Sequence, residues 1–184
     1  MKNFTQHKIF SIKWLAILLG IVFLLLLQEM QAQYISNNGA YVSISSGTVV
    51  RIDSIANDNT TTLNNAGTII LNTLINAGVT QGNGTYTISG NFTNTGTVAI
   101  GDTNGTVSMN GTSAQIMTMS GATSFYNLII DNAIGVTLSS TQTTITNNLT
   151  INSGKIFKIE AAKTLTVTGV IANSGGNAGF ILES

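Results

Sequence analysis

The chain has 184 residues, of which only seven are basic and seven acidic, and it contains no Cys and no Pro. Without Cys there is no disulfide framework, and with so few basic residues nucleic-acid binding has no electrostatic basis. The one His and the one Trp lie within the first 14 residues. Catalysis by His or Cys is therefore excluded for the rest of the chain, whose length suits one domain.

An apolar run over residues 14–27 follows three Lys residues and precedes Ala32. The run is shorter than the roughly 20 apolar residues that a membrane-spanning helix needs. A basic start, a short apolar run and a small residue at a cut site are typical of a secretory signal peptide. We expect a signal peptide over residues 1–32, cleaved between Ala32 and Gln33, with an uncleaved N-terminal anchor as the alternative. The chain then meets the membrane only through this segment, during export.

The remaining residues alternate apolar and polar side chains in pieces of three to five residues, separated by Gly, Asn or Ser. This period of two predicts short β-strands. The pieces also resemble one another: Asn127–Asp131 is echoed at 148–152 and again at 164–168. A Gly-Thr step precedes several pieces, at Gly67-Thr68, Gly84-Thr85, Gly96-Thr97 and Gly105-Thr106.

Degenerate repeats of this length indicate a solenoid, and we predict a right-handed parallel β-helix of about seven coils over residues 33–184. Its interior is expected to hold one ladder of apolar pairs. An antiparallel β-sandwich is the alternative, because Asn-Gly is a strong hairpin signal and residues 98–109 could close as a hairpin. Short strands and irregular corners favour the helix. The expected ladder consists of Leu128/Ile130, Leu149/Ile151 and Leu165/Val167.

The runs 105–115 and 123–132, and 135–138 leading to 148–155, resemble the β-helix repeats of large secreted or surface-displayed proteins of the Bacteroidetes. The resemblance covers about residues 39–184 and implies fold and location rather than activity. Such proteins usually end in a sorting domain for type IX secretion. None is recognised before Ser184, which implies a truncated product or a partial sequence.

Candidate chemistry is sparse. Enzymes that cleave polysaccharides need clustered carboxylates, and the best cluster is Arg51, Asp53 and Asp58, for which an exposed charge pair beside a loop is the favoured alternative. Asp102 and Asp131 follow strands and are expected to be turn residues. We predict no catalytic residues, no cofactor and no metal site, since Gly175-Gly176 lacks the Asp of a calcium-binding repeat.

Three weaker patterns remain. Thr-x-Thr pairs could bind ice if they stacked on one flat face, but their uneven spacing favours ordinary outward strand positions. Aromatic residues could stack on sugars, although core filling is the default. Asp53-Ser54-Ile55 resembles an O-glycosylation acceptor of the Bacteroidetes, with Ser54 as the modified residue and a plain strand end as the alternative. The Thr pairs are Thr85/Thr87, Thr95/Thr97, Thr141/Thr143 and Thr164/Thr166/Thr168.

These observations favour a secreted or cell-surface structural or adhesive module without catalytic activity. The alternative is a carbohydrate-binding or polysaccharide-degrading β-helix domain. The expected partners are glycans or cell-surface proteins. The apolar strand at 180–182 also predicts end-to-end self-association, because an uncapped solenoid exposes unpaired backbone groups.

Overall fold

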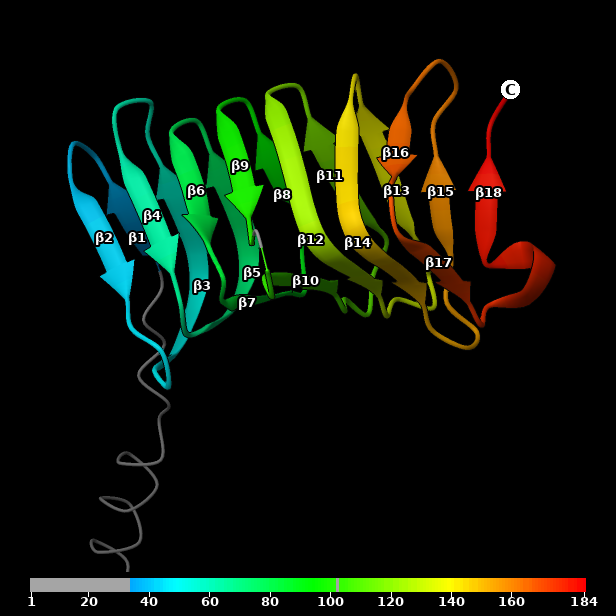
Figure 1. Ribbon diagram of the computed structural model, residues 1–184, viewed down its shortest axis with the longest axis horizontal. Coiled ribbons are helices and arrows are strands. Elements are labelled where there is room, and N and C mark those ends of the chain that lie inside the picture. Colours follow the sequence, from blue (N-terminus) through cyan, green and yellow to red (C-terminus); the bar gives the residue numbers. More distant parts are fainter. Residues whose placement is uncertain (1–33, 102) are drawn as a thin grey trace, which may run out of the picture. The chain divides into compact units, whose positions relative to one another are not determined.

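The computed structural model describes residues 34–101 and 103–184 (Figure 1). The predicted signal peptide, its cleavage between Ala32 and Gln33, and the turn role of Asp102 lie outside the described residues and stay predictions. Among the residues that are described, no helix is long and apolar enough to cross a membrane.

The described residues form a parallel β-solenoid of about seven coils (Figure 1). Every strand pairing among them is parallel, so the antiparallel sandwich is wrong. The possible hairpin over 98–109 does not form, because β9 pairs with β6 and β12 while β10 pairs with β7 and β12. The strands are β1 (Tyr34–Asn37), β2 (Tyr41–Ile44), β3 (Val49–Asn57), β4 (Thr62–Asn65), β5 (Thr68–Asn76), β6 (Val79–Gly82), β7 (Thr85–Ile88), β8 (Phe92–Asn94), β9 (Thr97–Ile100), β10 (Thr106–Met109), β11 (Gln115–Met119), β12 (Ala122–Ile130), β13 (Val136–Ser140), β14 (Thr143–Ile151), β15 (Phe157–Ile159), β16 (Leu165–Val167), β17 (Val170–Asn173) and β18 (Phe180–Leu182), with one 3₁₀ turn, η1 (Gly176–Ala178).

Each coil has three strand segments, and equivalent segments of successive coils pair into three ladders, here named A, B and C. Four long strands bend at a corner and contribute to two ladders each, which is why they have nine residues. Ladder A joins β1, 54–57 of β3, 73–76 of β5, β8, β11, β13, β15 and β18. Ladder B joins β2, β4, β6, β9, 122–125 of β12, 143–145 of β14 and β16. Ladder C joins 49–52 of β3, 68–71 of β5, β7, β10, 127–130 of β12, 148–151 of β14 and β17.

The Gly-Thr steps mark corners between ladders. Gly67, Gly84 and Gly105 precede strands of ladder C, while Gly96 precedes β9 in ladder B. Successive coils approach closely at these corners: a Cβ at Gly84 would lie 2.5 Å from the carbonyl oxygen of Gly67. No side chain fits at that separation, so the corner requires glycine.

Alternate side chains of every strand point into one continuous core, as the period of two predicts. Leu128 and Ile130 stack on Leu149 and Ile151 in ladder C, and all four are fully buried. The expected third layer is wrong: Leu165 pairs with Thr143 in ladder B. The next residue over Leu149 is Ile171, because the coil at this point is 22 residues long (149 to 171) and the 16-residue repeat of the sequence falls short of one coil.

A ladder of buried asparagines runs through the first four coils. Asn37, Asn57, Asn76 and Asn94 occupy the same inward position of ladder A, and each is at most 4% exposed. The Nδ2 of each donates to the Oδ1 of the next at 2.8 Å. Because a buried amide without partners is destabilising, this repeated bond favours one register of coil on coil.

A second amide site lies further along the solenoid, at the corner before ladder A. The Gln115 side chain is 1% exposed and its Nε2 donates to the carbonyl oxygens of Ile88 and Gly90. Its Oε1 accepts hydrogen bonds from the backbone N–H of Gly111 at 2.8 Å and from Nδ2 of Asn132 at 2.9 Å. The longest coil, 25 residues from Asn94 to Met119, therefore has its corner filled by a fully satisfied amide.

Substitution at Leu149 tests the register of ladder C. Leu149→Asp places an unpaired carboxylate among fully buried side chains and should destabilise the solenoid by about 3–5 kcal/mol. The neighbouring Thr150→Asp points outward and should cost about 0.5 kcal/mol. Urea denaturation of the two variants measures the difference, and equal losses would contradict this register.

Substitution at Asn76 tests the asparagine ladder. Asn76 accepts from Asn57 and Thr80 and donates to Asn94, so Asn76→Ala leaves three buried polar groups short of a partner. We expect a loss of about 2–4 kcal/mol in the free energy of unfolding. The exposed Asn59→Ala is the matched control and should change stability little. A loss no greater than that of the control would show that the ladder contributes nothing.

Candidate functional site

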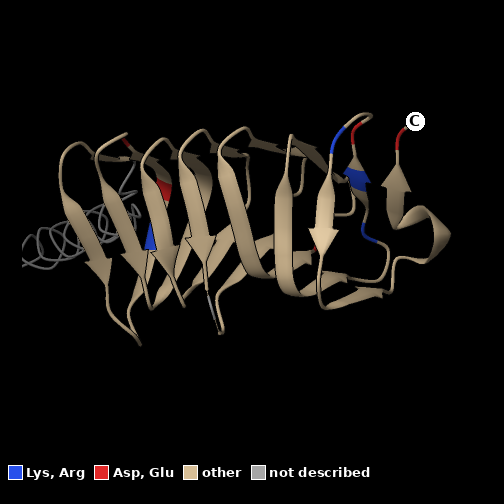
Figure 2. Ribbon diagram, turned by 45° about the horizontal axis from the view of Figure 1, so that its top comes forward, with Lys and Arg blue, Asp and Glu red and all other residues tan. Residues whose placement is uncertain are grey.

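Charged residues are confined to the two ends of the solenoid (Figure 2). Residues 59–154 contain only two of them, Asp102 and Asp131. Asp131 lies after β12, where turn residues were expected, and its carboxylate is 3.3 Å from the ammonium of Lys155. The broad middle of the solenoid therefore offers neutral side chains to any partner.

The predicted carboxylate cluster does not converge. Arg51 and Asp53 are both exposed on β3, but Asp53 lies at the bend where β3 passes from ladder C to ladder A. No ion pair joins them among the described residues, where the two salt bridges are Lys155–Asp131 and Lys158–Glu183. Asp58 follows the end of β3 at the next corner. Within the described residues no group of three acidic or metal-ligating side chains comes together.

Ser54, the predicted glycosylation acceptor, lies at the same bend and is half-buried. Its hydroxyl donates to Oδ2 of Asp53 at 3.1 Å. The modification itself stays a prediction. Gly175 and Gly176 lie at η1, where Gly176 has a positive φ of 70° and serves the turn.

The Thr-x-Thr pairs do not assemble into one array. Thr85 and Thr87 both point outward on ladder C, whereas Thr143 faces the core and is fully buried. Thr97 lies outward on ladder B, while the hydroxyl of Thr95 donates to the carbonyl oxygen of Asn76 at a corner. The uneven spacing in the sequence thus places these residues on different faces.

Most aromatic side chains fill the core, as expected. Phe92, Phe125 and Phe157 are fully buried, with ring centroids of Phe92 and Phe125 6.1 Å apart. Tyr34 and Tyr41 are exceptions, at 59% and 65% exposed, in the first coil. No aromatic platform for a sugar forms where the neutral surface is broadest.

Tyr86 carries a buried hydroxyl without a hydrogen-bond partner in the core. Burial is the larger influence on it and raises the pKa of Tyr86 well above its ordinary value. The Asn65 side chain lowers the pKa by less and does not reach hydrogen-bond geometry with the hydroxyl. No function needs this group, and it reads as a weak point of the core.

The outer surface of ladder B carries a row of seven neutral side chains, one from each coil. Their pairing is in register from β2 to β16, so the row runs the length of the described solenoid at about 4.8 Å per coil. Six are polar and one is Ala. In coil order they are Ser43, Asn64, Gln81, Ala99, Ser124, Thr144 and Thr166.

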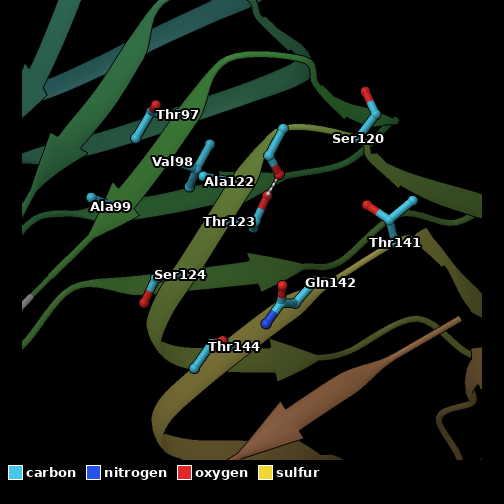
Figure 3. Close-up of a pocket in the computed structure, with 11 residues that line it drawn as sticks. Thr97, Val98, Ala99, Ser120, Ala122, Thr123, Ser124, Thr141, Gln142 and Thr144 are labelled. Carbon is cyan, nitrogen blue, oxygen red and sulfur yellow. Dashed lines mark hydrogen bonds between the residues drawn. The ribbon is translucent and has the colours of Figure 1, made fainter.

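A groove of about 470 Å³ lies on this row, across β9, β12 and the start of β14 (Figure 3). It is hollow because Ala99 and Ala122, both exposed, project only methyl groups outward. Around them stand hydroxyl groups and one amide, and no lining residue is charged. The remaining lining residues are Thr97, Val98, Ser120, Gly121, Thr123, Ser124, Thr141, Gln142 and Thr144.

The floor of the groove is held from inside. The hydroxyl of Thr123 donates to the carbonyl oxygen of Gly121 at 3.0 Å, the bond dashed in Figure 3. Nδ2 of Asn94, the last asparagine of the ladder, donates to Oγ1 of Thr123 at 2.9 Å and to the carbonyl oxygen of Ala122 at 3.2 Å. By contrast, Ser124, Gln142 and Thr144 make no side-chain hydrogen bond to another described residue and are available to a ligand.

Sequence reasoning missed this groove. Its residues are ordinary strand and corner residues, and only the lateral pairing of three coils brings them together. The signal that could have found it is the absence of charge between Asp58 and Asp131 apart from Asp102.

No protein-family model matches the chain, and no curated protein or solved structure matches it significantly. What the sequence shares with the repeats it resembles is supported at the level of architecture, a parallel β-solenoid of about seven turns.

Replacing Tyr86 by Phe tests the unpartnered hydroxyl. Tyr86→Phe should stabilise the solenoid by about 1 kcal/mol, because an unsatisfied buried group is removed without changing ring size. Above the ordinary tyrosine pKa of about 10 the unfolded chain loses the proton while the folded chain keeps it. The wild type should then lose stability as pH rises, and the variant should lose less. Urea denaturation at pH 7 and near pH 10.5 measures both effects; a less stable variant at pH 7 would mean that the hydroxyl has a partner.

Proposed function

We propose that the chain is a secreted or cell-surface structural or adhesive module that acts without catalysis. The observation that carries this proposal is the in-register row of neutral outward side chains on ladder B, from Ser43 to Thr166. A stack of coils presents one long surface whose chemistry varies little from coil to coil. Such a surface suits many weak, repeated contacts with another extended surface.

The signal-like N-terminus supports export, and the resemblance to Bacteroidetes repeats supports display at the cell surface. Export also fits the way in which the described coils are stabilised. Neither disulfides nor many charges contribute to them, and the core and backbone ladders supply stability at any salt concentration.

The separation of Asp53 and Asp58 favours adhesion over polysaccharide cleavage. Hydrolysis of a glycosidic bond uses two carboxyl groups that flank one bond. In this chain Asp53 lies at one corner of a coil and Asp58 at the next, and the groove itself contains no carboxylate. Self-association through the apolar edge near β18 remains a further prediction of the adhesive reading; Leu182 there is 68% exposed.

The test uses the full chain, expressed with its N-terminal segment and immobilised on beads. Retention of the beads on bacterial cells and on polysaccharide films is compared with beads that carry an inert protein of similar size. We expect retention that persists at 1 M NaCl, because exposed charge pairs, which salt screens, contribute little here. Retention no better than the inert control, or release of reducing sugar from the films, would overturn the proposal.

A further inference from the structure

We propose that the groove on ladder B binds a neutral saccharide through Ser124, Gln142 and Thr144. This inference rests on the proposed adhesive function and names its partner. Its volume of about 470 Å³ falls within the range of small-ligand sites, roughly 300–1,000 Å³.

The side chains of the groove select the chemistry of the ligand. A hydroxyl both donates and accepts hydrogen bonds, and the Gln142 amide donates from nitrogen and accepts at oxygen. The groove therefore suits a ligand that also donates and accepts around its rim. The methyl groups of Ala99 and Ala122 on the floor suit an apolar ring face. A sugar ring has both properties, since its hydroxyls lie at the rim and its C–H groups on the faces.

Other ligand classes fit less well. An anionic ligand such as a phosphate or an acidic polysaccharide finds no cation among the lining residues. A purely apolar ligand would leave the hydroxyls of Ser124 and Thr144 buried without partners, which is destabilising. A peptide strand adds to the edge of a sheet, whereas β9, β12 and β14 all have paired neighbours on both sides.

The floor is also preorganised. Thr123 is held from the core by Asn94, so the backbone of β12 under the groove is fixed before a ligand arrives. Fixed partners lower the entropy lost on binding. Without an aromatic platform each site should still be weak, and affinity for a long glycan would come from repeated contacts along the row.

The experiment is ¹⁵N-detected NMR titration of the exported chain with neutral cello-, xylo-, manno- and malto-hexaose, and with an oligogalacturonide as the acidic comparison. We expect at least one neutral hexaose to shift the amide signals of Ser124 and Thr144, with an affinity that does not change with salt. Binding of the acidic sugar alone, or shifts only outside the groove, would overturn the inference.

Two pairs of variants locate the site. Ser124→Leu fills the groove, and the matched Ser108→Leu makes the same change at an outward position of ladder C. Gln142→Ala removes the amide, and Gln81→Ala is its control on the same ladder. We expect Ser124→Leu and Gln142→Ala to weaken binding by about tenfold or more, the scale of one or two lost hydrogen bonds, and the controls to leave it unchanged. Equal weakening by a variant and its control would overturn the site, and unchanged melting temperatures confirm that each variant is folded.

The bead assay separates this inference from the function on which it rests. If Ser124→Leu abolishes hexaose binding and lowers bead retention, both stand. If wild-type beads are retained and Ser124→Leu beads are retained equally, the groove is not the adhesive site and the inference fails alone. If wild-type beads are not retained, the adhesive function fails, whatever the titration shows.

Discussion

The structure depends on one constraint, that each coil lies in register on the coil before it. A slip by a single residue would turn every inward side chain outward, because strand side chains alternate between faces. Apolar side chains such as Leu128 and Leu149 favour burial but tolerate sliding past one another. The asparagine ladder does not tolerate it, since Asn57 must find Asn37 and Asn76 at hydrogen-bond distance or leave a buried amide unpaired. We infer that the amides specify register while the apolar core supplies most of the stability.

The same ladder connects the interior to the candidate site. Met119 takes the inward position that follows Asn94 in ladder A, so the amide of Asn94 has no asparagine ahead of it. It turns instead to Thr123 and to the backbone at Ala122. The end of the polar ladder in the core thus coincides with the floor of the groove on the surface. An outer surface built on this hydrogen-bonded strand is more rigid than one built on a loop.

Much of the fold could be predicted from the sequence because a solenoid repeats its own physics. Alternation of apolar residues predicts which side chains face the core, and the Gly-Thr steps predict corners where coils approach too closely for a side chain. The assignment failed at Leu165 because coil length varies, from 18 residues (Asn76 to Asn94) to 25 (Asn94 to Met119). A ladder inferred from sequence spacing alone then drifts onto the wrong face. The buried Asn residues were missed for another reason: an Asn at a strand end is usually a turn residue, and only its neighbour in the next coil makes it a core residue.

The groove could not be predicted in the same way, since it is a property of three coils rather than of one repeat. Ala99, Ser124 and Thr144 are far apart in the sequence and become neighbours only through ladder B. The sequence does limit the chemistry of the site, because a stretch with two charged residues out of 96 (residues 59–154) cannot build a charged one. The pairing of coils then decides where small side chains adjoin and leave a hollow. Composition therefore restricts the class of ligand, and register determines its place.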